Sequence, residues 1–253
     1  MIRLLRPGSG QSRKNSLACG IISGVDMTEQ THSYYLALPQ SGKGAGVLVL
    51  HAWWGLNNFF RDFCDRLAQE GFVALAPDLF SGRVARTIGE AEQLNSQLNE
   101  AEDMPPLVLS AYEELRKHAT GDTLGTIGFS FGAYWARWLA QEKPQSIRAV
   151  TIFYSDGWNV QGSNAAYLGH FAESDTYMSE EDKNQLEDSL KALNRPTTFF
   201  TYPGTGHWFM ESDRPDAYNP HAARLAWERT IAFLHEQLEG VGRYHKASGD
   251  STL

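Results

Sequence analysis

Gly128-Phe129-Ser130-Phe131-Gly132 follows the pattern Gly-x-Ser-x-Gly. The preceding residues, 123–127, are mostly compatible with a β-strand, and residues 133–140 have helical periodicity that stops at Lys143-Pro144. In this context the pattern is typical of a nucleophile elbow, a turn so tight that only glycine lets neighbouring chain approach. Such a turn lifts the serine hydroxyl clear of the sheet, beside free helix N–H groups that can hold an oxyanion. The alternative is a turn serine that caps the helix.

The composition argues against several classes of protein. The chain has 253 residues, 42% of them hydrophobic, which is enough for a sizeable core. A formal net charge of −8 argues against a nucleic-acid partner. The two cysteines, Cys19 and Cys64, suggest neither a disulfide framework nor a metal site, and no apolar run approaches a membrane span. We therefore expect a cytoplasmic monomer or homodimer that acts on a small molecule without a metal or cofactor.

The chain is predicted to contain one folded domain. Residues 1–26 are rich in Gly, Ser and basic side chains and lack the continuous apolar stretch of a signal peptide, so we expect a disordered extension. Met27 is an alternative start. Residues 27–240 form the domain, and the polar residues 241–253 form a loose tail.

Strand and helix patterns alternate along this domain. Apolar runs predict strands, and helical periodicity predicts the segments between them. The expected strands are 32–38, 46–51, 72–76, 123–127, 149–154, 166–171 and 197–202, and the expected helices are 58–69, 89–99, 107–118, 133–142, 179–193 and 220–239. This alternation predicts an α/β fold with a mostly parallel sheet, in which ligands bind beyond the carboxyl ends of the strands.

Three residues in the right order predict a catalytic triad. In a fold with this elbow the serine is followed in sequence by an acid and then by a histidine. Asp175 follows one predicted strand and His207 follows the last one, so we predict Ser130 as nucleophile, His207 as base and Asp175 as the acid that orients it. Asp156 and Glu173 are the alternative acids.

The oxyanion hole requires two backbone donors. One is expected at Phe131, directly after the serine, and the other at Trp53, in the loop after the strand at 46–51. Aromatic side chains near these strand ends are expected to wall the pocket, with core packing as the alternative. They are Trp53, Trp54, Phe80, Phe131, Trp158 and Trp208.

Residues 30–240 resemble the dienelactone hydrolase family, the carboxymethylenebutenolidase-like α/β-hydrolases. The resemblance lies in motifs that occur in order and at family spacing. They are residues 51–57 (HAWWGLN), Arg61-Asp62, residues 76–80 (APDLF), residues 128–132 (GFSFG), residues 202–207 (YPGTGH) and residues 226–230 (AWERT). The resemblance implies an α/β-hydrolase fold with helices on both faces of the sheet, the triad named above, and Trp53 and Phe131 as oxyanion donors.

Three departures from the family pattern concern the site. The family usually has cysteine where this chain has Ser130, and glutamate where it has Ala52. The family's namesake enzyme is thought to use arginines to hold a substrate carboxylate, and Glu211 stands at one of those positions. Arg83 or Arg86 is expected to retain the other contact. The expected reaction is therefore hydrolysis of an ester, lactone or thioester through a serine acyl-enzyme. The departures leave open whether dienelactone is itself a substrate.

Substrate contacts are expected from residues at the strand ends, namely Trp54, Arg83, Arg86, Trp158, Trp208 and Glu211. Two alternatives stay open: a non-catalytic ligand-binding homologue and a small peptidase.

Overall fold

The computed structural model describes residues 33–155, 157 and 160–240. These residues belong to a unit that spans His32–Leu253, separate from Met1–Thr31. The predicted N-terminal extension, the C-terminal tail, Asp156 and Trp158 lie outside the described residues.

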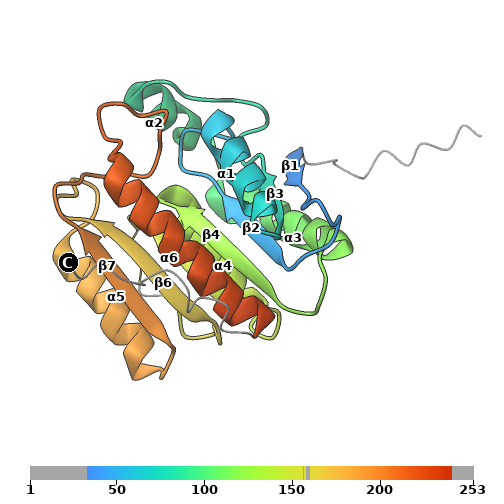
Figure 1. Ribbon diagram of the computed structural model, residues 1–253. Helices are drawn as coiled ribbons and strands as arrows, with labels where there is room; N and C mark the ends of the chain where they lie inside the picture. The colour runs from blue at the N-terminus through green and yellow to red at the C-terminus, as the bar shows by residue number, and fades with distance from the viewer. Residues whose placement is uncertain (1–32, 156, 158–159, 241–253) are drawn as a thin grey trace, which may run out of the picture. The chain divides into compact units, whose positions relative to one another are not determined.

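Seven strands form one sheet in the order β1-β3-β2-β4-β5-β6-β7 (Figure 1). They are β1 (Tyr34–Ala37), β2 (Gly46–Leu50), β3 (Val73–Pro77), β4 (Leu124–Phe129), β5 (Ile147–Phe153), β6 (Ala166–Ala172) and β7 (Thr197–Tyr202). Only β1 is antiparallel to its neighbour; the other pairs are parallel. Strands β2 to β6 are almost entirely buried, because helices cover both faces of a parallel sheet. The predicted α/β class with a mostly parallel sheet is confirmed.

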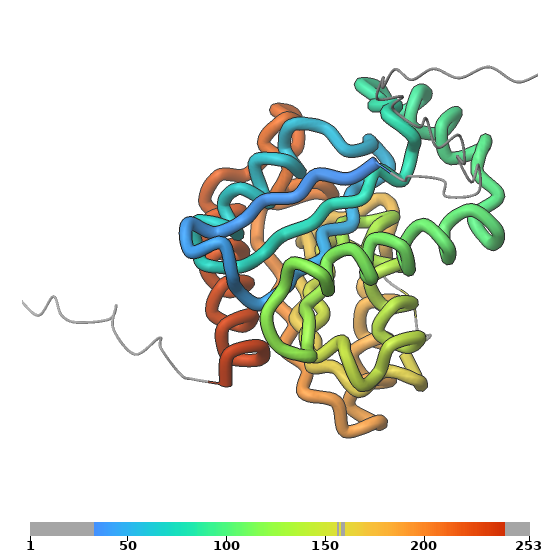
Figure 2. Tube along the Cα trace, turned by 90° about the vertical axis from the view of Figure 1, so that its right-hand side faces the viewer, coloured from blue at the N-terminus to red at the C-terminus, as the bar shows by residue number. Residues whose placement is uncertain are grey.

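Six helices occur in the described part of the chain. They are α1 (Asn58–Gln69), α2 (Ile88–Ser96), α3 (Glu100–His118), α4 (Phe131–Glu142), α5 (Glu180–Ala192) and α6 (Pro220–Glu239). Apolar side chains of α1 and α6 pack into the core on one face of the sheet, and those of α3, α4 and α5 pack into the core on the other. Figures 1 and 2 show α6 and α3 on opposite sides of the strands.

Local signals place several helix ends correctly. Ser179 caps α5, and its side chain and that of Asp182 form the predicted capping box. The predicted limits of α6, 220–239, match those of the structure.

Helix α3 begins at Glu100, whereas the sequence predicts a start at residue 107, after two prolines. Its first turn carries Glu100, Glu102 and Asp103, whose charges favour a helix N-terminus, and Met104 is buried. These interactions offset the main-chain hydrogen bonds that Pro105 and Pro106 cannot make.

The parallel strands bring distant parts of the sequence to one edge of the sheet. Leu50 of β2 pairs with Gly128 of β4, and Phe129 of β4 pairs with Phe153 of β5. The loops after β2, β4, β5, β6 and β7 therefore leave the sheet at its carboxyl edge, where the predicted site residues lie.

Candidate active site

Ser130 occupies a strained turn between β4 and α4. Its φ of 49° and ψ of −113° lie in a region that non-glycine residues rarely adopt. The turn is fixed on both sides, because the Ser130 N–H donates to the carbonyl of Phe153 at 3.0 Å and the Ser130 carbonyl accepts from the Ala133 N–H at 2.9 Å. This is the geometry of a nucleophile elbow.

The two glycines of the elbow are required by space. A Cβ on Gly132 would lie 2.5 Å from the carbonyl oxygen of His51 and closer still to that of Leu50. A Cβ on Gly128 would collide with the backbone of Ala133. Because the colliding atoms are backbone, the neighbours cannot move aside as a flexible side chain could.

The structure brings Ser130, His207 and Asp175 together. The Ser130 Oγ lies 2.9 Å from Nε2 of His207, and Nδ1 of His207 lies 2.7 Å from Oδ2 of Asp175. The side chains of His207 and Asp175 are only 5% and 2% exposed, so water competes little for these contacts. With Nδ1–H donating to the carboxylate, Nε2 is free to accept the serine proton.

The loops that carry the acid and the histidine are joined by further hydrogen bonds. The Ser174 N–H donates to the carbonyl of Thr205 at 3.1 Å, and the Gly204 N–H donates to Oε2 of Glu173 at 2.9 Å. Asp175 Oδ1 accepts from the Tyr177 N–H at 2.8 Å. The side chain of Glu173, an alternative acid in the sequence, therefore bonds a backbone N–H of the histidine loop, while the side chain of Asp175 contacts His207 itself.

The two backbone N–H groups predicted for the oxyanion hole are those of Phe131 and Trp53. Within the described ranges, no acceptor takes the N–H of Phe131, the first residue of α4, or the N–H of Trp53, in the loop after β2. Gly55 fixes that loop with a φ of 90°, and a Cβ there would collide with the carbonyl oxygen of Arg83.

Aromatic rings surround His207. Trp208 stacks on Trp53 with ring centroids 6.0 Å apart and lies edge-on to Trp54 at 5.0 Å. Tyr177, which the sequence analysis did not identify, lies 4.9 Å from the His207 ring and 5.1 Å from Trp208. Three of the predicted wall residues thus come together, with Tyr177 added.

Phe80 and Phe131, also predicted as pocket walls, lie 5.6 Å apart, and Phe80 also packs edge-on against His51. Phe80 is fully buried and belongs to a core cluster. Phe80 therefore packs in the core, which was the alternative to a place in the pocket wall.

Of the two predicted arginines, Arg83 is held by side-chain contacts, and Arg86 makes a contact through its main chain. Arg83 donates from Nε to the carbonyl of Phe80 at 3.0 Å and from Nη1 to the side chain of Gln97. The side chain of Arg86 is exposed, and its main-chain carbonyl accepts from Nη1 of Arg214 at 3.0 Å.

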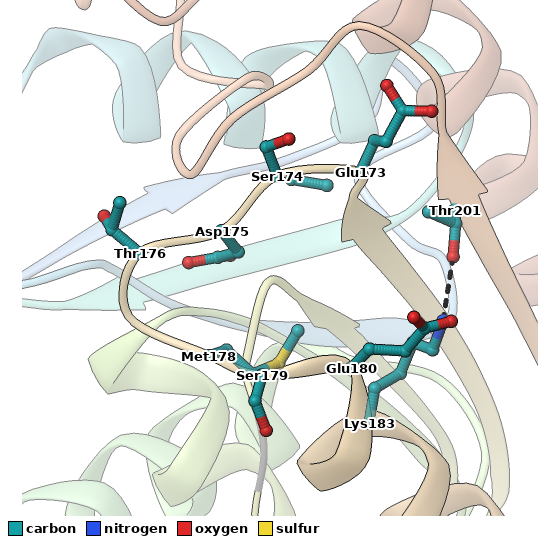
Figure 3. Close-up of a pocket in the computed structure, with 10 residues that line it drawn as sticks. Glu173, Ser174, Asp175, Thr176, Met178, Ser179, Glu180, Lys183 and Thr201 are labelled. Carbon is teal, nitrogen blue, oxygen red and sulfur yellow. Dashed lines mark hydrogen bonds and ion pairs between the residues drawn. The ribbon is translucent and has the colours of Figure 1, made fainter.

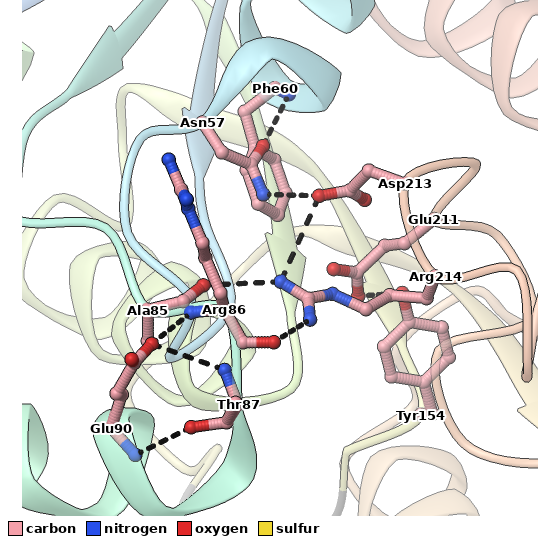
Figure 4. Close-up of polar contacts among 10 residues, drawn as sticks. All are labelled: Asn57, Phe60, Ala85, Arg86, Thr87, Glu90, Tyr154, Glu211, Asp213 and Arg214. Carbon is pink, nitrogen blue, oxygen red and sulfur yellow. Dashed lines mark hydrogen bonds and ion pairs between the residues drawn. The ribbon is translucent and has the colours of Figure 1, made fainter.

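Glu211 is fully buried, and its Oε1 accepts from the hydroxyl of Tyr154 at 2.6 Å (Figure 4). Burial raises the pKa of this carboxyl to about 8, an effect that the nearby Asp213 adds to and the contacts with Tyr154 and Arg214 oppose. No described residue bonds its Oε2. The raised pKa favours the protonated form of Glu211 near neutral pH.

Arg214 joins two loops of the site, and the sequence analysis did not identify it. Its guanidinium lies 3.6 Å from the ring centroid of Trp54, and it donates to the carbonyls of Ala85 and Arg86 (Figure 4). Arg214 comes shortly after His207 in the sequence, and Tyr154 comes directly after β5. No sequence pattern indicates which loop either side chain will contact.

A pocket of about 580 Å³ lies beside the acid loop, between β7 and the start of α5 (Figure 3). Asp175, Glu180 and Lys183 are among its lining residues, and Lys183 Nζ donates to Thr201 Oγ1 at 3.2 Å. Its charged lining residues are three carboxylates, Glu173, Asp175 and Glu180, and one lysine, Lys183.

Two other kinds of site are not found in the part of the chain that the structure describes. Within it, no group of three His, Cys, Asp or Glu side chains is arranged to hold a metal. No helix in the same ranges has the length and apolar character needed to cross a membrane.

Comparisons with known proteins identify the family and the fold. The model of the dienelactone hydrolase family matches residues 33–238. "Protein usf" of Aquifex pyrophilus is 29% identical, with 81% of this chain and 93% of that protein covered, and a "Putative carboxymethylenebutenolidase" of Aquifex aeolicus is 28% identical with the same coverage. A crystal structure of a "Putative Dienelactone Hydrolase" from Klebsiella pneumoniae superimposes with a TM-score of 0.71 at 25% identity, covering 80% of this chain and 92% of that one. The fold is thus that of the α/β-hydrolases, and the chain belongs to the dienelactone hydrolase family, whose members are carboxylic ester and lactone hydrolases.

Proposed function

We propose that the protein hydrolyses a neutral carboxylic ester, lactone or thioester through an acyl-enzyme on Ser130. The observation that carries the proposal is the continuous chain of contacts from Ser130 Oγ through His207 to Asp175, built on a strained elbow. Strain of this kind persists at functional sites because the surrounding structure enforces it.

In the acylation step, Ser130 Oγ attacks the carbonyl carbon of the substrate while His207 Nε2 takes the hydroxyl proton. The carbonyl oxygen becomes an oxyanion, which the N–H groups of Phe131 and Trp53 stabilise by donating hydrogen bonds. The carbon–leaving-group bond then breaks, and the leaving alcohol, thiol or ring oxygen takes the proton from His207. Asp175 stabilises the imidazolium throughout and fixes its orientation.

In the deacylation step, water enters and His207 Nε2 removes one of its protons. The resulting hydroxide attacks the acyl carbon, a second oxyanion forms in the same hole, and the bond to Ser130 Oγ breaks. Ser130 regains its proton from His207, so the enzyme returns to its initial state and the acid is released.

The surroundings of the triad favour a neutral substrate. The rings of Trp53, Trp208 and Tyr177 lie next to His207, and aromatic surfaces of this kind bind apolar acyl or leaving groups. Arg83 is bound to Phe80 and Gln97, so this side chain would have to break both contacts to neutralise a substrate carboxylate.

The proposal is tested by steady-state kinetics with p-nitrophenyl acetate, p-nitrophenyl butyrate and an aromatic lactone. The wild-type protein should turn over at least one of them, and Ser130→Ala should lower kcat by roughly 10⁴-fold or more, because triad members act as a unit. A folded Ser130→Ala variant that keeps more than about a tenth of the rate contradicts the triad. A wild-type protein that binds these esters without hydrolysing them is the result expected of a ligand-binding homologue.

A further inference from the structure

Tyr154 combines three features that a residue used only for packing does not need. It directly follows β5 with a φ of 38°, a strained value for an aromatic residue. Its main-chain N–H donates to the carbonyl of His170 at 2.8 Å, which fixes the strained turn to β6. Its ring lies 4.7 Å from the ring of His207 and is only 1% exposed.

The other rings next to His207 differ from Tyr154 in exposure or in position. Tyr177 is 47% exposed, and Trp208, although buried, is the next residue in the same loop as the histidine. Tyr154 is therefore the neighbour that can oppose rotation of the imidazole. Asp175 holds only one edge of that ring, through Nδ1.

Glu211 bonds the hydroxyl at the far end of the Tyr154 ring. Its carboxyl is fully buried and accepts the tyrosine hydroxyl at 2.6 Å, and the Glu211 backbone is part of a turn in which its N–H donates to the carbonyl of Trp208 at 2.9 Å. A buried carboxyl is costly, and a hydrophobic residue would fill the same space without that cost. The hydrogen bond therefore needs a reason beyond stability.

We propose that Tyr154 and Glu211 form a positioning pair for His207, in which Glu211 fixes the tyrosine hydroxyl and the tyrosine ring holds the imidazole in line between Ser130 and Asp175. The pair rests on the proposed function, because it positions the base of that reaction. Small misplacements of a catalytic group are expensive, since a shift of about 1 Å can cost on the order of 10²-fold in rate.

The test uses four single variants of the full chain, and the double variant of the first two. Tyr154→Phe removes the hydroxyl and keeps the ring, Glu211→Met removes the acceptor, and Glu211→Gln keeps an acceptor oxygen and cannot ionise. Tyr202→Phe is the matched control, because the hydroxyl of Tyr202 is also buried and also bonds a buried side chain, His170 Nδ1 at 2.8 Å.

Tyr154→Phe and Glu211→Met should each lower kcat about tenfold, the scale of one buried hydrogen bond felt in the transition state, with KM within about twofold. The double variant should be no slower than either single one, because both break the same contact. Glu211→Gln should lose less than Glu211→Met. Tyr202→Phe should lower the urea midpoint about as much as Tyr154→Phe does, while its kcat stays at the wild-type value.

A second readout does not depend on turnover. The low-field proton resonance of the His207 Nδ1–H, which reports its bond to Asp175, should shift or broaden in Tyr154→Phe and stay in place in Tyr202→Phe. If the wild-type protein hydrolyses no ester, the proposed function fails while this resonance still tests the pair. An unchanged kcat and an unchanged resonance in a folded Tyr154→Phe variant would overturn the pair, as would a rise in KM alone.

Discussion

Replacing Glu211 by glutamine should make the protein more stable than wild type at alkaline pH and change the pH dependence of its stability. The side chain is fully buried, and burial raises its pKa from an ordinary 4.5 to about 8. At a pH between these two values, Glu211 keeps its proton in the folded protein and has lost it in the unfolded chain. Unfolding then releases a proton, so the free energy of unfolding falls as pH rises. Glutamine keeps an oxygen for the Tyr154 hydroxyl and cannot ionise.

The size of the effect follows from the pKa difference. The contribution of Glu211 to stability is fully present below pH 4.5 and lost as pH rises toward 8. Each pH unit in this range costs somewhat more than about 1 kcal/mol, which amounts to on the order of 5 kcal/mol over the whole range. Above pH 8 the folded protein has also ionised the group, and the dependence on this residue ends. Asp213 and Arg214 face the same carboxyl and partly cancel each other.

The assay is urea unfolding of wild type and Glu211→Gln at each pH unit from 5 to 9. The difference in unfolding free energy, variant minus wild type, should increase up to about pH 8 and then stay constant. Glu92→Gln, at an exposed position, serves as the control for loss of one negative charge. A difference that is the same at every pH would show that Glu211 is ionised throughout, and would refute the account of its burial.

Two further predictions concern other buried positions. Burial lowers the pKa of His51 to about 4 and that of His170 to about 3, so the unfolded chain takes up protons below pH 6.5 that the folded protein does not, and stability should fall from pH 6.5 toward 4. His170→Gln should reduce the slope of the urea midpoint in this range, and an unchanged slope would contradict it. Ala52 is fully buried, so Ala52→Glu should destabilise the serine enzyme by several kcal/mol. In Ser130→Cys, whose thiol can ionise, the same change should recover part of the lost kcat/KM, and additive effects of the two substitutions would exclude this coupling.

The sequence was sufficient for the elements whose cause is local. The elbow at Ser130, the cap at Ser179 and the limits of α6 depend on residues close in the chain. The sequence also predicts that Asp175 and His207 lie near each other, because each follows a parallel strand. Parallel strands bring their carboxyl ends to one edge of the sheet, whatever the sequence between the strands.

The sequence was not sufficient where tertiary contacts decide. Nothing local indicates that Tyr154 bonds Glu211, or that the guanidinium of Arg214 packs on Trp54. The sequence assigned Glu211 only a position relative to His207, and its burial depends on how the segment after His207 packs against Tyr154. The start of α3 before Pro105 likewise depends on the burial of Met104 against the sheet.

Whether Ser130 is the nucleophile can be determined by mass spectrometry after reaction with a fluorophosphonate. One adduct per chain should form, and peptide mapping should place it on Ser130. Ser130→Ala should remain unlabelled, and His207→Gln should label far more slowly, because the base 2.9 Å from Oγ is lost. A folded wild-type protein that stays unlabelled, or an adduct on any other residue, would contradict the account.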